Sequence, residues 1–199
     1  MNQKEKFIYY SSPEHWFQTA LELNGSIEEL FETRWRSYYV QNYHIDETSK
    51  VKRPQNSRAI YLLMSYTLEN LLKGIHVLRD ASLVVKGKLD AKIKTHNLNI
   101  LSKTLKIRNS LAQTMFQDYI SHLCIAQGRY PIGNNEQSFH KQPSIIDEDF
   151  VLYKLLYNRY SKKLSTEFSK KGWQSGFKNE ELNTKPNEFR FIINPLYKP

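Results

Sequence analysis

Residues 55–80 read QNSRAIYLLMSYTLENLLKGIHVLRD and contain no proline. Apolar side chains recur in this stretch at alternating steps of three and four, the spacing that places them on one face of an α-helix. They are Tyr61, Met64, Leu68, Leu71, Ile75 and Leu78, and Leu72 widens the face. A polar row lies beside them, made of Tyr66, Glu69, Lys73 and His76. The stretch therefore predicts a long helix that supplies much of the core.

The segment before this helix predicts two more helices. A helix start at Ser12–Glu14 and a stop at Asn24–Gly25 enclose the first of them. A capping box at Ser26–Glu29 opens the second, which we expect to end near Asn42. Residues 43–56 are polar and contain a proline, so they predict a loop.

The segment after the long helix predicts shorter elements. Residues 81–95 form a basic connection, and a short helix is expected from Leu98 to Leu105. Ser110–Gln113 is a capping-box candidate that opens the next helix, which should stop at Gly128.

A last long helix is expected to begin at the three carboxylates Asp147–Asp149, which favour the first turn of a helix. It should end near Lys171, and the remainder, residues 172–199, reads as an irregular tail that packs on the bundle. Within the tail, Phe189–Ile193 alternates enough for a short strand or an extended segment. The prediction is thus an all-α antiparallel bundle of about five to six helices over residues 1–171.

Composition limits the class of protein. The chain has 199 residues, of which 13% are aromatic, so wholesale disorder is excluded. A single cysteine excludes a disulfide framework, and the six histidines lack the spacing of zinc ligands. We therefore predict no metal and no cofactor. The chain shows no apolar run long enough for a membrane helix and no signal peptide, so we expect a cytoplasmic protein.

The net charge of +9 is concentrated in two separate segments. Residues 79–108 hold eight basic and two acidic side chains, and residues 154–199 hold ten basic and four acidic ones. Such segments attract polyanions such as RNA. The alternative is a solvated lysine-rich surface that only aids solubility.

Three segments together resemble the HEPN superfamily of helical bundles. They are Leu63–Ile75 (LMSYTLENLLKGI), Thr95–Leu98 (THNL, with Asn97 in place of the usual Asp) and Gly128–Pro131 (GRYP). The resemblance implies a helical bundle, often a homodimer, that acts in RNA metabolism, stress response or defence against mobile elements. Catalytic members are metal-independent ribonucleases whose signature is an Arg followed, after four to six residues, by a His.

This chain departs from that signature. Seven residues separate Arg36 from His44, and the stretch that begins Arg108–Asn109 carries Gln113 where the His would stand. Glutamine cannot act as an acid or a base, so we expect a protein that binds RNA, a nucleotide or a protein partner without cleaving RNA. The alternatives are a metal-independent endoribonuclease with an atypical Arg/His site and a pure protein-interaction module.

Eight residues are the candidate binding site. They are Lys92, Lys94, His96, Asn97, Arg129, Tyr130, Glu69 and Lys73. Structural roles compete with binding for five of them. Glu69 and Lys73 also suit a buried ion pair, and His96 also suits a contact with the long helix. Arg129 and Tyr130 also suit a loop anchor, in which the Arg binds backbone carbonyls and the Tyr packs. The rival basic surface is the last helix, which carries Lys162, Lys163, Lys170 and Lys171.

Overall fold

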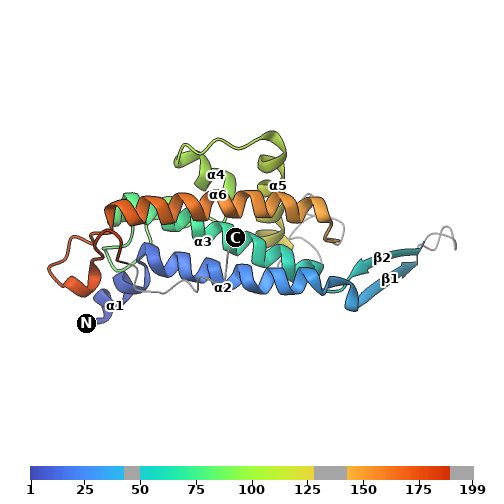
Figure 1. Ribbon diagram of the computed structural model, residues 1–199, viewed down its shortest axis with the longest axis horizontal. Helices are drawn as coiled ribbons and strands as arrows, with labels where there is room; N and C mark the ends of the chain where they lie inside the picture. Colours follow the sequence, from blue (N-terminus) through green and yellow to red (C-terminus); the bar gives the residue numbers. More distant parts are fainter. Residues whose placement is uncertain (43–49, 128–142, 189–199) are drawn as a thin grey trace.

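The long amphipathic stretch forms α3 (Ser57–Arg79), the central helix of the molecule (Figure 1). The computed structural model describes residues 1–42, 50–127 and 143–188. The other helices and the strands are α1 (Gln3–Tyr10), α2 (Pro13–Glu32), β1 (Tyr38–Asn42), β2 (Lys50–Pro54), α4 (Leu98–Thr104), α5 (Leu111–His122) and α6 (Asp147–Lys171). Short helical turns are η1 (Arg34–Arg36), η2 (Ala81–Leu83), η3 (Ala91–Ile93), η4 (Leu123–Gln127) and η6 (Glu180–Leu182). The predicted all-α bundle is confirmed.

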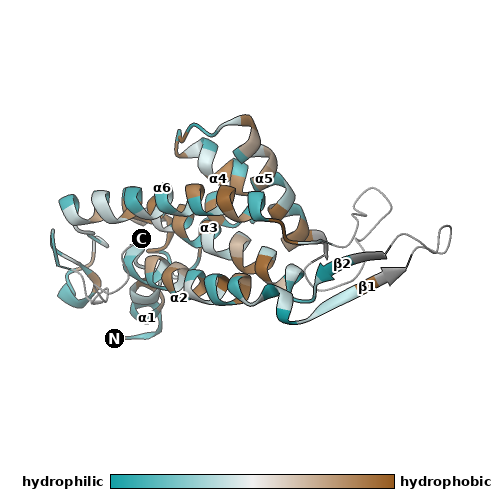
Figure 2. Cartoon of the chain, turned by 45° about the vertical axis from the view of Figure 1, so that its right-hand side comes forward, coloured by the Kyte–Doolittle hydropathy of each residue, from teal (hydrophilic) through white to brown (hydrophobic). Residues whose placement is uncertain are grey.

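The apolar face of α3 is the centre of the core. Met64, Leu68, Leu71 and Ile75 are all fully buried, as the spacing predicts. α3 contacts α2, α4, α5 and α6, so nearly its whole circumference is covered. Figure 2 shows hydrophilic residues on the outer sides of these helices. Among the described residues, none of the helices combines the length and the apolar content that crossing a bilayer requires.

The long helices do not all run the same way. α2 is antiparallel to α6, because Arg34 near its end binds Asp147 at the start of α6. α3 and α6 run in parallel, since Tyr61 contacts Asp149 near their beginnings and Arg79 contacts Glu167 near their ends. The short helices α4 and α5 lie between α3 and α6 in the sequence and allow this parallel arrangement.

Gly74 lets three helices approach closely. A side-chain carbon at this position would lie 2.8 Å from Leu164 of α6 and 3.1 Å from Trp16 of α2. Glycine weakens a helix interior by about 1 kcal/mol relative to alanine. Here that cost is offset by packing that a larger residue would disrupt.

The prediction of two N-terminal helices with a stop at Asn24–Gly25 is wrong. One continuous helix, α2, spans both. Asn24 is buried, and its side-chain oxygen accepts a hydrogen bond of 2.8 Å from the Tyr153 hydroxyl. Asn24 by itself favours the end of a helix, but its contact with Tyr153 holds it inside α2. The preceding α1 was not predicted, although Asn2 and Glu5 form its capping box.

The predicted helix end near Asn42 is also wrong, and so is the predicted loop where β2 occupies residues 50–54; residues 43–49 of that loop lie outside the described residues. α2 ends at Glu32, and an antiparallel hairpin follows in which β1 pairs with β2. The register places Tyr38 opposite Pro54 and Tyr39 opposite Arg53. The hairpin projects beyond the ends of α2 and α3 (Figures 1 and 2).

The remaining helices agree with the sequence. The capping box of Ser110 and Gln113 opens α5, and α6 begins at Asp147. The acidic first turn of α6 binds neighbouring side chains, because Tyr61 donates a hydrogen bond of 2.5 Å to Asp149. Burial raises the pKa of the Asp149 carboxyl and of the Tyr61 hydroxyl. The three carboxylates therefore start the helix and fasten it to its neighbours.

The described part of the tail packs on the bundle. Trp173 and Thr184 exchange backbone hydrogen bonds in an antiparallel bridge. The Trp173 indole donates to the backbone oxygen of Val77, and the Thr184 hydroxyl donates to Glu14. The predicted segment Phe189–Ile193 lies outside the described residues.

Leu71→Asp is expected to unfold the protein. The side chain is fully buried on α3, and an unpaired carboxylate there costs several kcal/mol against a typical total stability of about 5–15 kcal/mol. Ala59→Asp, exposed in the first turn of the same helix, is the control and should leave the urea midpoint nearly unchanged. A folded Leu71→Asp variant with the wild-type midpoint would contradict the assignment of the core.

Candidate nucleic-acid interface

A charged cluster lies inside the bundle on the polar row of α3. Lys73 Nζ lies 2.6 Å from Glu69 Oε1, and both side chains are buried. The second carboxylate oxygen, Oε2, lies 2.9 Å from His96 Nδ1. An ionised carboxylate only accepts hydrogen bonds, so Nδ1 carries the proton and Nε2 is left for another partner. His96 is 54% exposed.

Three candidate residues, Glu69, Lys73 and His96, are thus brought together. The buried part of the cluster, Glu69 and Lys73, has a structural role as an ion pair. Lys73 also lies 6.0 Å from the centre of the Trp16 ring, so α2 contributes to its surroundings. Cys124 is half-buried nearby, and burial raises the pKa of its thiol, which disfavours the reactive thiolate. The cluster offers one accessible group, the outer edge of His96.

His76, also on the polar row, holds α4 against α3. Its Nε2 lies 3.1 Å from the backbone oxygen of Leu101 and 3.2 Å from the Thr104 hydroxyl. Burial lowers the pKa of His76, so the ring is neutral at pH 7 and Nε2 donates to the carbonyl. This histidine is therefore a structural contact.

The other candidate residues are dispersed. Lys92 and Lys94 are exposed at η3, near the turn that carries His96. Asn97 caps α4, since its side-chain oxygen accepts a hydrogen bond of 3.0 Å from the Ile100 amide. Arg129 and Tyr130 lie outside the described residues.

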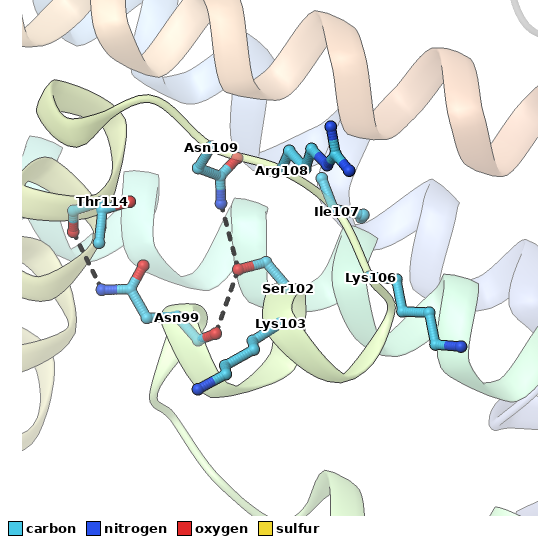
Figure 3. Close-up of a pocket in the computed structure, with 8 residues that line it drawn as sticks. All are labelled: Asn99, Ser102, Lys103, Lys106, Ile107, Arg108, Asn109 and Thr114. Carbon is cyan, nitrogen blue, oxygen red and sulfur yellow. Dashed lines mark hydrogen bonds between the residues drawn. The ribbon is translucent and has the colours of Figure 1, made fainter.

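The structure joins the two basic segments that the sequence presents as rivals. A hollow of about 390 Å³ lies over the link between α4 and α5 (Figure 3). It is lined by Asn99, Ser102, Lys103, Lys106, Ile107, Arg108, Asn109 and Thr114. A second hollow of about 510 Å³ shares Lys106, Ile107 and Arg108, and α6 closes it with Arg159, Lys162, Lys163, Thr166 and Glu167. We call these two adjoining hollows together the basic hollow.

Hydrogen bonds fix the walls of the basic hollow. Arg159 donates to the backbone oxygen of Arg108 at 2.8 Å and to Gln113 Oε1 at 2.6 Å, which ties α6 to the α4–α5 link. In Figure 3, Asn109 donates to Ser102, and Asn99 donates to the backbone oxygen of Thr114. The floor of the hollow is thus held in one arrangement.

Among the described residues, Glu167 is the one carboxylate that lines the basic hollow, and it is neutralised. Arg79 donates two hydrogen bonds to Glu167, at 2.9 and 2.6 Å, and Lys163 lies 3.2 Å from the same carboxylate. The bidentate contact with Arg79 lowers the pKa of Glu167 to about 2. Its stabilising contribution is therefore complete above the ordinary glutamate pKa of about 4.5 and is lost as the pH falls towards 2.

Four cations of the basic hollow are available to a ligand. Lys103, Lys106, Arg108 and Lys162 are exposed, and within the described part of the chain no carboxylate pairs with them. Sequence analysis placed these residues in two rival segments. Only the parallel packing of α3 and α6 brings the segments together.

Gln113, at the position where the ribonuclease signature would carry a histidine, is fully engaged. Its side-chain oxygen accepts from the Ser110 amide at 3.1 Å and from Arg159. Its role is to cap α5 and to orient Arg159. The Arg108–Gln113 stretch therefore provides a cation to the basic hollow and no proton-transfer group.

Comparison of the chain with protein-family models, with curated proteins and with solved structures gave no match. The resemblance to the HEPN superfamily thus stays a prediction that rests on the three sequence segments.

Lys73→Met is expected to lower the free energy of unfolding by about 3 kcal/mol at pH 7, because it leaves the Glu69 carboxylate buried without its closest cation. Adding Glu69→Gln to Lys73→Met should recover a large part of that loss. Lys92→Met, at an exposed position, is the control and should change stability by less than about 0.5 kcal/mol. Urea denaturation of the four proteins gives the comparison, and an unaffected Lys73→Met variant would contradict the buried pair.

Proposed function

We propose that this chain is a cytoplasmic, HEPN-like protein that binds RNA without cleaving it, in a prokaryotic stress or defence system. The observation that carries the proposal is the basic hollow, in which two segments far apart in sequence place six cations around two adjoining hollows. A field of this kind attracts a phosphate backbone over distances beyond direct contact. Lys92, Lys94 and the outer edge of His96 are a second, neighbouring contact in this proposal.

The backbone at Lys106 supports a binding role for its side chain. Lys106 has φ +57°, a left-handed conformation, directly after the last residues of α4. Glycine is the usual residue at such a helix end, and a side chain there costs about 1 kcal/mol. Lys106 carries a backbone cost that a glycine would avoid, and this supports a binding role for its charged side chain.

The residues around Arg108 support the proposal that the RNA is bound without cleavage. RNA cleavage without a metal needs a group that moves a proton to or from the ribose hydroxyl. Gln113 cannot do so, and the described residues that line the basic hollow include no histidine. The hollow is suited to hold phosphates in place.

Lys106→Glu combined with Lys162→Glu is expected to weaken RNA binding at least about tenfold and to flatten its salt dependence by about one to two counterions. The pair takes one residue from each basic segment. Binding to labelled single-stranded RNA is measured by fluorescence anisotropy between about 50 and 200 mM salt. The same RNA, incubated in EDTA and run on a denaturing gel, should remain intact.

Lys170→Glu with Lys171→Glu is the matched control, since both residues are exposed on α6 and the change in charge is identical. It should weaken binding much less. Lys106→Gly gives a second readout, because it should raise thermal stability while lowering affinity. Equal losses in both double variants would show a general charge effect and contradict the basic hollow.

We also propose that two copies of the chain associate. Leu111 and Met115, four residues apart on α5, are 77% and 64% exposed. Val151 and Leu155 form a similar exposed pair on α6. The two helices contact each other, and Arg159 of α6 donates a hydrogen bond to Gln113 of α5. Exposed apolar side chains on packed helices are typical of an interface, and a symmetric dimer is the commonest way to cover them.

Light scattering at micromolar concentration should give twice the chain mass of 23.6 kDa. Leu111→Lys with Met115→Lys should give a folded monomer. Tyr10→Lys, at an exposed residue of α1, is the control and should stay dimeric. A monomeric wild-type protein would contradict self-association.

A further inference from the structure

The hairpin of β1 and β2 adds little to the core of the protein. It projects from the end of the bundle in two views (Figures 1 and 2). An isolated two-stranded hairpin is marginal in water, because it has no second layer to bury its side chains. Packing in the core therefore does not determine which residues the hairpin carries, and the types of residue that it exposes are informative about its function.

Large aromatic side chains are exposed on and beside this hairpin. Trp35 lies in η1, directly before β1, and Tyr38 and Tyr39 begin the strand. All three are about half exposed, and Val40 follows them with similar exposure. Tyr38 and Tyr39 are successive strand residues, so they point to opposite faces of the ribbon. Aromatic surface is thus available on both faces.

Cations accompany the aromatic rings. Lys52 Nζ lies 5.0 Å from the centre of the Tyr38 ring, and the Arg53 guanidinium lies 5.2 Å from that of Tyr39. Residues 33–42 and 50–58 contain six basic residues and no acidic one, whereas the connecting residues 43–49 carry Asp46 and Glu47. The preceding α2 is acidic, so charge averaged over the first fifty residues conceals this basic element.

The base of the hairpin contains a donor that lacks an acceptor. Arg53 Nε is buried, and it has no hydrogen-bond partner in the described part of the chain. It borders a hollow of about 420 Å³. The lining is Tyr39, Arg53, Pro54, Gln55, Ser57, Arg58 and Pro143. Arg53 and Arg58 place positive charge at this hollow, which favours an anion such as a phosphate.

We propose that the hairpin binds the unpaired bases of single-stranded RNA, which stack on Trp35, Tyr38 and Tyr39 while Lys52 and Arg53 contact the phosphates. The combination of exposed rings with cations beside them is the general means by which proteins hold single strands. This inference rests on the proposed function and deepens it, because it names unpaired RNA as the ligand. It adds a second contact, distinct from the basic hollow.

Unpaired RNA fits the hairpin better than a duplex does. Bases within a duplex are stacked on each other and cannot stack on Trp35 or Tyr38. The major groove of double-stranded RNA is too narrow for side chains to read, although that of DNA admits a two-stranded ribbon. Binding to duplex DNA is therefore the competing outcome that the experiment must distinguish.

The test compares binding of an oligouridylate of about 15 nucleotides with a duplex RNA and a duplex DNA of the same length. Trp35→Ala with Tyr38→Ala and Tyr39→Ala should weaken oligouridylate binding at least about tenfold, with an unchanged salt slope because no charge is removed. Trp35→Phe with Tyr38→Phe and Tyr39→Phe is the matched control and should retain most of the affinity. Quenching of tryptophan fluorescence by oligouridylate should disappear in Trp35→Phe.

The outcomes separate this inference from the proposed function. If the wild-type protein binds none of the three nucleic acids, both fail. If the Lys106→Glu/Lys162→Glu variant loses affinity while the triple alanine variant does not, the basic hollow stands and the hairpin inference is wrong. Preference for duplex DNA, or binding to anionic lipid vesicles in place of oligouridylate, would also overturn it.

Discussion

The carboxylate of Glu69 connects α3 with the segment that leads into α4. One oxygen binds Lys73 within α3, and the other binds His96 in the segment that follows η3. A buried carboxylate without both partners would be strongly unfavourable, so the connection between α3 and α4 must return to this point on the helix. The Asn97 cap and α4 follow immediately. The position of the basic hollow, which begins at the end of α4, depends on that return.

The ends of α3 are fixed by different contacts, and both involve α6. At one end Tyr61 donates to Asp149, and at the other Arg79 binds Glu167 and the backbone oxygen of Leu105. Arg79 thereby holds the α4–α5 link next to α6. The parallel course of α3 and α6 is what brings residues 106–108 against residues 159–167. The concave basic surface is a consequence of topology, which local sequence does not encode.

Sequence reasoning succeeded where one face of a helix had to be apolar. The residues of α3 and the acidic start of α6 follow rules that operate within one or two turns. It failed at Asn24, where a buried Tyr153 hydroxyl outweighs the local preference of asparagine and glycine to end a helix. It failed again at the hairpin, where one strand reads YYVQN and the other KVKRP, so neither shows the alternation of apolar and polar residues that marks a half-buried strand. A strand that buries little leaves little hydrophobic pattern to detect.

The basic hollow and the hairpin are two contacts that act separately in electrostatic terms. The hairpin joins the start of α3 at Ser57, whereas Arg79, at the other end, contacts the α4–α5 link. With a rise of 1.5 Å per residue, α3 separates the hairpin from the Arg79 end of the basic hollow by about 33 Å, and Arg159, eight residues before Glu167 on the parallel α6, lies about 12 Å nearer. Both distances exceed twice the screening length of about 8 Å at physiological salt, so the two surfaces are largely screened from each other. An RNA strand bound at one surface would raise the effective concentration of RNA at the other surface. This coupling requires a strand that is long enough to span the bundle. Under the proposed binding of RNA, the bundle would act as a rigid spacer, and the affinity would then depend on the length of the unpaired RNA.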